Sequence, residues 1–331
     1  MVVSLAGNGQ LVSKGQLANR PIGCGTAAAF GASPSPFEIV EGNPPLKDLW
    51  ITLGIPAKLR LASGSRFVSV PQEIDCTAGC RAEIVNGDHF LAEGNDSIVR
   101  ICTEFETTCR FLVLHQSAAS WTLVDYLDSP FEKYEAPTVS VETAQDRRWL
   151  VRRGFGGGGT GVYLSNADWF ELHCGTLQRV LTLPSRGDDV NARPARYFST
   201  RFKAFHRSGS RESLEFGYIV LFEDYEDQRQ LWQEERTVVF SRPDSIGAFV
   251  FDPAASDISA AFEKKVFAFD SMEANDFLEF AWNRLLRIAG DPADRRRDWL
   301  RNFLEDLPDS PKVRTIDALL NDRQRARHDK R

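Results

Sequence analysis

The sequence predicts a mainly β protein: antiparallel meander sheets, arranged as a sandwich or a partial, propeller-like stack, with an α-helical C-terminal segment. Three observations lead to this fold class. Short β-rich runs separated by turn residues recur from about residue 49 to residue 252. No segment of helical periodicity interrupts them, so the long crossovers that parallel strands need are missing from the pattern. After residue 252 the apolar residues take a helical spacing.

Composition divides the 331 residues into three stretches. Residues 1–45 are rich in small and polar residues, which is typical of a flexible leader. Residues 46–252 are predicted to form the antiparallel β domain. Residues 253–331 are predicted to form a helical C-terminal segment whose basic tail, from Arg323, is frayed.

The predicted strands recur at short intervals along the chain. Asn86-Gly87 is the strongest turn signal and predicts a hairpin between residues 82–85 and 89–92. Residues 185–194 are polar and predict a loop. The full set of predicted strands is 49–53, 66–70, 82–85, 89–92, 97–102, 110–114, 120–127, 138–141, 148–151, 160–164, 169–172, 177–183, 197–205, 214–222, 236–240 and 248–251.

Three short helices are predicted after the strands. The first begins at Asp270, which has the spacing of a capping box with Glu273, and ends at Gly290. The second begins at Asp291-Pro292 and the third at Ser310-Pro311, because an N-cap residue followed by proline is a helix start signal.

Bulk composition excludes several classes of protein. Aromatic residues make up 11% of the chain, and disordered chains lack them. The formal net charge of −6 argues against a broad nucleic-acid surface, so nucleic acid is not an expected partner. No stretch approaches the roughly 20 apolar residues that cross a bilayer, so no membrane span is predicted.

Among the six cysteines, Cys102 and Cys109 are the informative pair. They flank the predicted tip of a hairpin, where facing residues lie within disulfide reach. Cys76 and Cys80 are close together in a loop and form a second predicted disulfide. A Cys102–Cys109 disulfide would indicate a periplasmic or secreted protein, and free thiols a cytoplasmic one.

One glycine-rich segment is a candidate ligand-facing loop. Residues 154–161 match the G-x-G-x-x-G pattern, but a predicted strand follows, so the helix N-terminus of a dinucleotide site is missing. No cofactor is therefore predicted. Glycines beside basic residues can still hold an anion through backbone N–H groups. The residues of this candidate loop are Arg152, Arg153, Gly156, Gly157, Gly158 and Gly159.

Carboxylates are the main candidates for catalysis, but none forms a recognisable motif. The run of residues 223–227 lacks the spacing of a calcium loop and follows the most apolar strand, so we expect a solvated loop. Asp125 and Asp128, and likewise Glu104 and Glu106, would act on a glycoside only at a suitable separation in space. No catalytic residue is assigned.

Cysteine and histidine give no assigned site either. A zinc spacing that starts at Cys76 lacks a second pair unless Cys102 and Cys109 supply it, so no metal ligand is assigned. Cys174 could act as a nucleophile only with a distant histidine, because on a strand the adjacent His173 points to the opposite face.

The C-terminal helices carry the expectation about protein partners. An apolar stripe around Trp299 and Phe303 would serve as an interface if exposed, but not if buried against the sheet. The basic patch of residues 295–297 with Arg301 has acidic residues interleaved, which indicates a solvated face.

These observations favour a non-catalytic binding or structural protein, exported from a bacterium, whose ligand and partners the sequence leaves unknown. The alternative is a hydrolase on a β scaffold that acts on a glycan or another polymer with a carboxylate pair. The alternative requires two carboxylates that converge in one cleft, which a structure can reveal.

Overall fold

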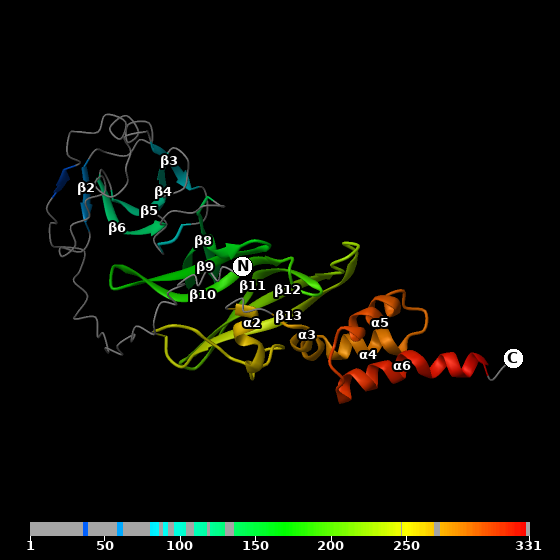
Figure 1. Cartoon of the computed structure of the whole chain (residues 1–331). Helices are drawn as coiled ribbons and strands as arrows, with labels where there is room; N and C mark the ends of the chain where they lie inside the picture. The colour runs from blue at the N-terminus through cyan, green and yellow to red at the C-terminus, as the bar shows by residue number, and fades with distance from the viewer. Residues whose placement is uncertain are drawn as a thin grey trace. The chain divides into compact units, whose positions relative to one another are not determined.

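Two β-sheets and a set of C-terminal helices make up the described part of the chain (Figure 1). The computed structural model describes residues 36–38, 58–61, 80–85, 89–91, 96–103, 109–117, 120–129, 136–245, 247–267 and 272–328. All of them belong to the unit Pro34–Arg331.

The first sheet has six strands in the order β1-β2-β6-β5-β4-β3. Their bounds are β1 Pro36–Glu38, β2 Lys58–Leu61, β3 Cys80–Val85, β4 Asp96–Thr103, β5 Cys109–Ser117 and β6 Ser120–Ser129. Neighbouring strands are antiparallel except β2 and β6, which are parallel. The expectation of purely antiparallel pairing is therefore wrong at β2.

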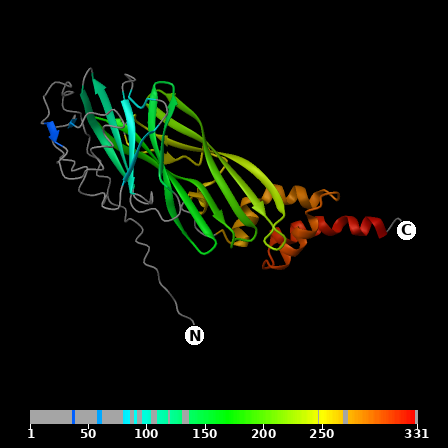
Figure 2. The ribbon, with the colours of Figure 1, turned by 90° about the horizontal axis from the view of Figure 1, so that it is seen from above.

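The second sheet has eight strands in the order β14-β13-β12-β11-β10-β9-β8-β7. Their bounds are β7 Thr138–Ala144, β8 Arg147–Gly159, β9 Val162–His173, β10 Thr176–Asp189, β11 Ala195–Ser208, β12 Arg211–Glu223, β13 Gln230–Arg242 and β14 Val250–Phe251. All neighbours pair antiparallel, so strand follows strand as one meander (Figure 2). The predicted fold class, antiparallel meander sheets with C-terminal helices, is confirmed.

The second sheet is buried on both faces where it carries strands β7 to β10. On β8, Trp149 and Val151 belong to the larger core, whereas Leu150 between them packs with Phe111 of the first sheet in a smaller core. This is the consequence of strand geometry, because successive side chains point to opposite faces. The larger core continues into the helices through residues such as Phe277.

The second sheet curls at one end. Within the described residues, β10 and β11 pair only between Arg186–Asp189 and Arg196–Ser199, so the two strands separate beyond this register. The backbone N–H of Phe249, which follows β13, donates to the carbonyl of Val180 on β10 at 2.8 Å. The last strands thus return toward β10 around a cluster of aromatic side chains: Trp149, Trp169, Phe202, Phe205 and Phe216.

The helical segment packs on the second sheet. Its elements are a short 3₁₀ turn Ala260–Phe262, α2 Glu263–Phe267, α3 Ala274–Phe280, α4 Trp282–Gly290, α5 Arg297–Glu305 and α6 Pro311–His328. The ring of Phe277 on α3 lies 5.0 Å from that of Phe222 on β12, and Trp299 on α5 lies 5.9 Å from Trp232 on β13. Among the described helices, none is long and apolar enough to span a membrane.

Two arginine side chains of the second sheet also donate hydrogen bonds to backbone carbonyl groups of the helices. Arg196 on β11 donates to the carbonyl of Lys265 in the last turn of α2 at 2.9 Å. Arg236 on β13 donates to the carbonyl of Phe280, the last residue of α3, at 2.7 Å. Carbonyls in the last turn of a helix have no partner within the helix, so these cations satisfy them.

One predicted strand and part of one predicted loop are wrong. Residues 89–91 bend instead of forming a strand, because the N–H of Phe90 donates to the Asp96 carboxylate at 2.8 Å. β3 accordingly pairs with β4. Strand β10 runs to Asp189, inside the predicted loop of residues 185–194, because β9 and β11 pair with it on both sides. The predicted strands 49–53 and 66–70 lie outside the described residues.

The helices also start at other residues than their signals predict. α3 begins at Ala274, with a capping box between Glu273 and Asp276, and Asp270 lies outside the described residues. A turn at Ala281 separates α3 from α4, where one continuous helix is predicted. These breaks leave the predicted apolar face buried, because Phe277 and Ala281 both lie in the larger core.

The later helices show one wrong and one correct start signal. α5 begins at Arg297, five residues after Pro292, because residues between them form a turn. Ser310 does accept the N–H of Val313 at 3.2 Å, ahead of α6, as the N-cap signal predicts. The tail expected to fray from Arg323 is helical to His328.

Candidate functional site

An open pocket lies where strand β6 of the first sheet meets strands β8, β9 and β10 of the second. Its volume is about 450 Å³, within the range of small-molecule sites. Polar and apolar side chains share its wall. The lining residues are Asp125, Tyr126, Leu127, Asp128, Arg152, Phe170, Leu177 and Arg179.

Asp168 anchors the arginines of this pocket. Its Oδ2 accepts a hydrogen bond from Arg152 Nη2 at 2.5 Å, and its Oδ1 accepts one from the Thr182 hydroxyl at 2.6 Å. Arg179 Nη1 stands 3.6 Å from the same Oδ1. Asp168 is only 6% exposed, so its charge depends on these donors. Strand alternation places Asp168 on the same face of β9 as Phe170, which lines the pocket.

Asp125 joins the two sheets at the pocket wall. One of its carboxylate oxygens accepts the N–H of Tyr126 at 2.9 Å, and the other accepts the N–H of Leu177 on β10 at 2.8 Å. Both oxygens of this buried carboxylate are therefore engaged by backbone donors.

Asp128 stands on the more open side of the pocket. Its Oδ1 accepts a hydrogen bond from Arg110 Nε at 2.5 Å, and its backbone carbonyl accepts one from Arg152 Nη1 at 2.5 Å. The guanidinium of Arg110 lies 4.7 Å from the centre of the Tyr126 ring. Arg110 is buried, whereas the side chain of Asp128 is 48% exposed, so this carboxylate can still meet solvent or a ligand.

The candidate ligand-facing loop takes a different form in the structure. Gly156, Gly157, Gly158 and Gly159 form the end of strand β8 in the β8–β9 hairpin, so they are paired strand residues and not a loop. The hairpin turns only after Gly159, with a tight backbone approach: a Cβ on Gly158 would lie 2.7 Å from the carbonyl of Val162. Glycine is needed because the two strands come so close.

The two arginines of that candidate loop serve opposite faces of β8. Arg152 reaches the pocket, whereas Arg153 donates to Ser140 at 2.6 Å and to Glu142 at 3.2 Å on β7. The structure therefore brings Arg152 to a site with Arg179, and it does not bring Arg153 or the glycines there. Whether the glycine hairpin faces a ligand stays a prediction.

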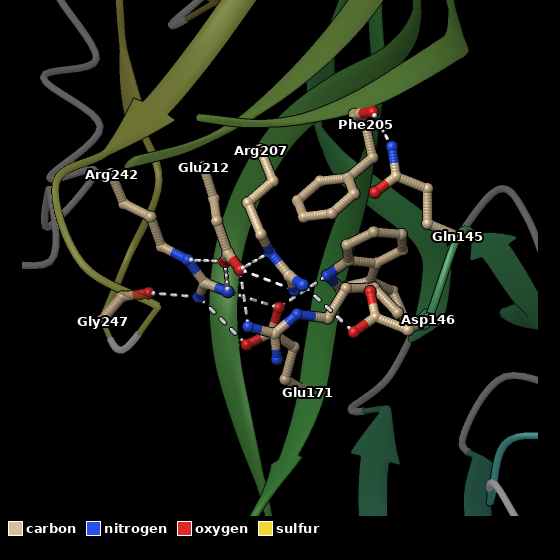
Figure 3. Close-up of polar contacts among 10 residues, drawn as sticks. Gln145, Asp146, Glu171, Phe205, Arg207, Glu212, Arg242 and Gly247 are labelled. Atoms are coloured by element: carbon tan, nitrogen blue, oxygen red, sulfur yellow. Dashed lines mark hydrogen bonds and ion pairs between the residues drawn. The ribbon is translucent and has the colours of Figure 1, made fainter. Parts of the chain in front are cut away.

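A second cluster of arginines and acids lies at the curled end of the sheet (Figure 3). Glu212 on β12 is its centre and is 1% exposed. Its carboxylate accepts hydrogen bonds from three arginines on three strands, as Figure 3 shows for Arg207 and Arg242. The bonds are 2.6 Å from Arg147 Nη2, 3.1 Å from Arg207 Nε and 2.6 Å from Arg242 Nη2.

Arg242 links this cluster across the curl. It also donates to both oxygens of Glu171 on β9, at 3.0 and 2.8 Å, and to the carbonyl of Gly247 at 3.0 Å. Trp149 Nε1 donates to Glu171 at 2.8 Å. Burial by itself would raise the pKa of Glu212, but the hydrogen bonds from Arg147 and Arg242 outweigh it, and the pKa lies below its usual value.

The cysteines are oxidised where the structure describes them. Cys102 and Cys109 face each other across β4 and β5 and form a disulfide, with an S–S distance of 2.01 Å. They therefore cannot complete a zinc site as thiolates. Cys174 is also disulfide-bonded, which removes it as a nucleophile. Cys76 lies outside the described residues, and Cys80 is the first residue of β3, so their predicted pairing stays a prediction.

The remaining acidic candidates either lie in a solvated loop or lie outside the described residues. The acidic run after β12 forms an exposed hairpin loop, in which Arg229 pairs with Asp224 and Asp227 at 3.6 Å each. Glu104 and Glu106 lie outside the described residues. Among the described residues, no three histidine, cysteine, aspartate or glutamate side chains gather as metal ligands.

The structure decides between the two outcomes given for the apolar stripe of the helices. Trp299 and Phe303 are buried, with Trp299 against Trp232 of the sheet, so this stripe is not an exposed interface. Arg297, in the basic patch expected to be solvated, is also buried and donates to the carbonyl of Leu320 at 2.8 Å. A partner for these helices stays a prediction, and it would have to use another surface.

Sequence reasoning missed the residues that organise both clusters, although one signal was available. Along β12, the buried side chains follow every second residue, and Glu212 continues that buried series two positions before Leu214. Arg242 continues the same series after Phe240 on β13. A charged residue in phase with buried apolar residues indicates a paired internal charge.

No protein-family description and no curated protein matches this chain in sequence. The candidate site therefore stands on its geometry alone.

Proposed function

We propose that the protein is a non-catalytic binding protein that holds a small polar ligand in the pocket between β6 and β10. One observation carries this proposal: the pocket's acids are engaged by protein donors, while Arg179 is 60% exposed beside them. A nucleophile must be free to attack its substrate. Asp125 is not free, because both its oxygens accept backbone N–H groups.

The hydrolase alternative has one observation in its favour. Asp125 and Asp128 line the same pocket, as a catalytic carboxylate pair would. Against it, one oxygen of Asp128 is already held by a hydrogen bond from the buried Arg110. The two functions differ in what happens to the ligand, so recovery of the ligand separates them.

A ligand screen with mass spectrometry tests the proposal. Sugars, sugar acids, amino acids and short oligosaccharides are screened by thermal shift on the full chain, and each ligand is then recovered and weighed. We expect a ligand that stabilises the protein and comes back intact. A ligand cleaved by wild type, and not by Asp128→Asn, would replace the proposal with the hydrolase.

A matched pair of variants localises the binding. Leu177→Trp fills the pocket, because Leu177 lines it, and should abolish the thermal shift. Leu319→Trp introduces the same side chain at an exposed position of α6 and should leave the shift unchanged. Equal binding by Leu177→Trp and wild type would show that the ligand lies elsewhere.

The same proposal includes export to an oxidising compartment. The Cys102–Cys109 disulfide and the oxidised Cys174 support it, since disulfides persist outside the reducing cytoplasm. Protein from its native host should react with a thiol alkylator only after reduction. Full alkylation without reductant would place the protein in the cytoplasm.

A further inference from the structure

The chemistry of the pocket wall narrows the class of ligand, on the assumption that the proposed binding function is right. Two guanidinium groups, Arg152 and Arg179, share the single carboxylate of Asp168. Asp125 and Asp128 line the same pocket, so its wall carries charges of both signs. A guanidinium that shares its carboxylate with a second guanidinium can still bind an anionic group of a ligand.

Arg179 is the arginine with donors to spare. Arg152 is four-fifths buried and already donates to Asp168 and to the carbonyl of Asp128. Arg179 is 60% exposed, and its 3.6 Å distance to Asp168 exceeds normal hydrogen-bond length. A guanidinium presents its N–H groups as a planar fork that fits a carboxylate in a bidentate manner.

The same pocket also offers an acceptor. Asp128 lines the same pocket and uses Oδ1 for Arg110, and its side chain is half exposed. An ionised carboxylate accepts several hydrogen bonds, so it can receive a hydroxyl or ammonium group from a ligand. Phe170 and Leu177 add apolar surface to the pocket.

We propose that the pocket binds a small carboxylate that also carries hydrogen-bond donors, such as a sugar acid or an amino acid. Arg179, beside Arg152, holds the carboxylate, and Asp128 accepts the donors. A dianion fits less well, because Asp125 and Asp128 would repel its second charge. The volume of about 450 Å³ accommodates a molecule of this size.

NMR of the full chain with ¹⁵N-arginine tests this ligand class directly. D-glucuronate, L-glutamate, acetate and D-glucose are titrated up to about 10 mM, where even weak binding is detected. Arg179→Gln identifies the Arg179 Nε–H signal by removing it. We expect that signal to shift with glucuronate or glutamate, less with acetate, and not with glucose. The stronger of the first two identifies the source of the carboxylate.

Arginine variants give the quantitative outcome. Arg179→Gln should weaken carboxylate binding by about tenfold or more, as expected for the loss of a charge-assisted hydrogen bond. Arg186→Gln is the matched control, since Arg186 is an exposed arginine on the same strand outside the pocket. Both variants should keep the wild-type melting temperature.

Three results would overturn the ligand class. Glucose that binds as well as glucuronate, or carboxylate binding that survives Arg179→Gln, removes the role of the arginine, although blocking by Leu177→Trp would leave the binding function intact. No shift of the Arg179 signal with any carboxylate also overturns it. If the screen above then finds a neutral or cationic ligand, only the ligand class is wrong; if it finds a cleaved one, the binding function is wrong.

Discussion

Glu212 and Asp168 are buried carboxylates on strands of the same sheet, and arginines converge on each of them. At Glu212 the arginines end on protein acceptors, including Glu171 and a backbone carbonyl, and the cluster is closed. At Asp168 one arginine is held and the other, Arg179, extends into an open pocket. Arginines and carboxylates therefore link strands of the sheet at Glu212, whereas at Asp168 they leave one arginine side chain exposed in a pocket.

The position in the sheet explains this difference. Glu212 lies where the sheet curls, so strands that are distant in the sheet order supply donors from several sides. Asp168 lies on the opposite, outward face, where the first sheet covers β8 and β9 incompletely and leaves room beside Asp128. A buried charge whose partners are all protein groups can help to specify the fold. A charge that lies beside a pocket can bind a ligand.

The largest expected effect comes from the closed cluster. Glu212→Gln should lower the free energy of unfolding by about 3–5 kcal/mol, because the buried Arg242 and the partly buried Arg147 and Arg207 lose the buried carboxylate that they share. Urea unfolding followed by tryptophan fluorescence measures this loss. Glu235→Gln, which removes an exposed ion pair with Lys203 on the same sheet, should leave the midpoint near wild type. Similar losses of unfolding free energy in both variants would mean that the buried cluster at Glu212 contributes no more to stability than an exposed ion pair does.

Removal of the Cys102–Cys109 disulfide tests whether strands β4 to β6 can unfold independently of strands β12 and β13. Cys102→Ala/Cys109→Ala should cost about 2–3 kcal/mol, as the loss of a short closed loop predicts. Arg110, which supports Asp128, directly follows Cys109. Hydrogen exchange should therefore speed up in β4 to β6 and change little in β12 and β13. Uniform acceleration would show that the two regions unfold as one.

The sequence predicts those features of the two regions that depend on residues close together in the chain. Alternation and turn residues predict most strands, and the spacing of Cys102 and Cys109 predicts a hairpin pairing that the structure contains. Strand β9 is predicted as two pieces, because Asn166 and Asp168 look like a break. In the structure Asp168 stays in the strand because Arg152 and Thr182 satisfy it.

The clusters themselves could not be predicted, because they depend on contacts between distant strands. The partners of Glu171 lie on β8 and β13, and nothing local brings Arg242 to it; the curl of the sheet does. The pocket likewise joins β6 to β10 through Asp125 and Leu177. A scan for charges in phase with buried residues would have flagged Glu212 and Arg242, without naming their partners.

Acid should weaken the closed cluster in a defined direction. The pKa of Glu212 is lowered in the folded protein, since hydrogen bonds from Arg147 and Arg242 outweigh the effect of burial. Its contribution is therefore complete above about pH 4.5, the range of an unfolded glutamate, and is lost as the pH falls through the lower folded value. The stability gap between wild type and Glu212→Gln should shrink on acidification below that range. A gap that stays constant to pH 2 would contradict this assignment.

The smallest effect separates the two arginines of the pocket. Arg152→Gln should cost about 1–2 kcal/mol, because Asp168 loses its shortest charged donor while buried. Arg179→Gln should change the free energy of unfolding by no more than about 0.5 kcal/mol, because its side chain is largely exposed and makes only a long ion pair. Urea unfolding of both variants, with Arg186→Gln as control, measures the difference. If Arg179 costs as much as Arg152, it is part of the packed structure in the way that Arg242 is, and its charge is not free for a ligand. If Arg179→Gln leaves the free energy of unfolding unchanged and yet abolishes carboxylate binding, the cluster at Asp168 differs from the cluster at Glu212 in function as well as in burial.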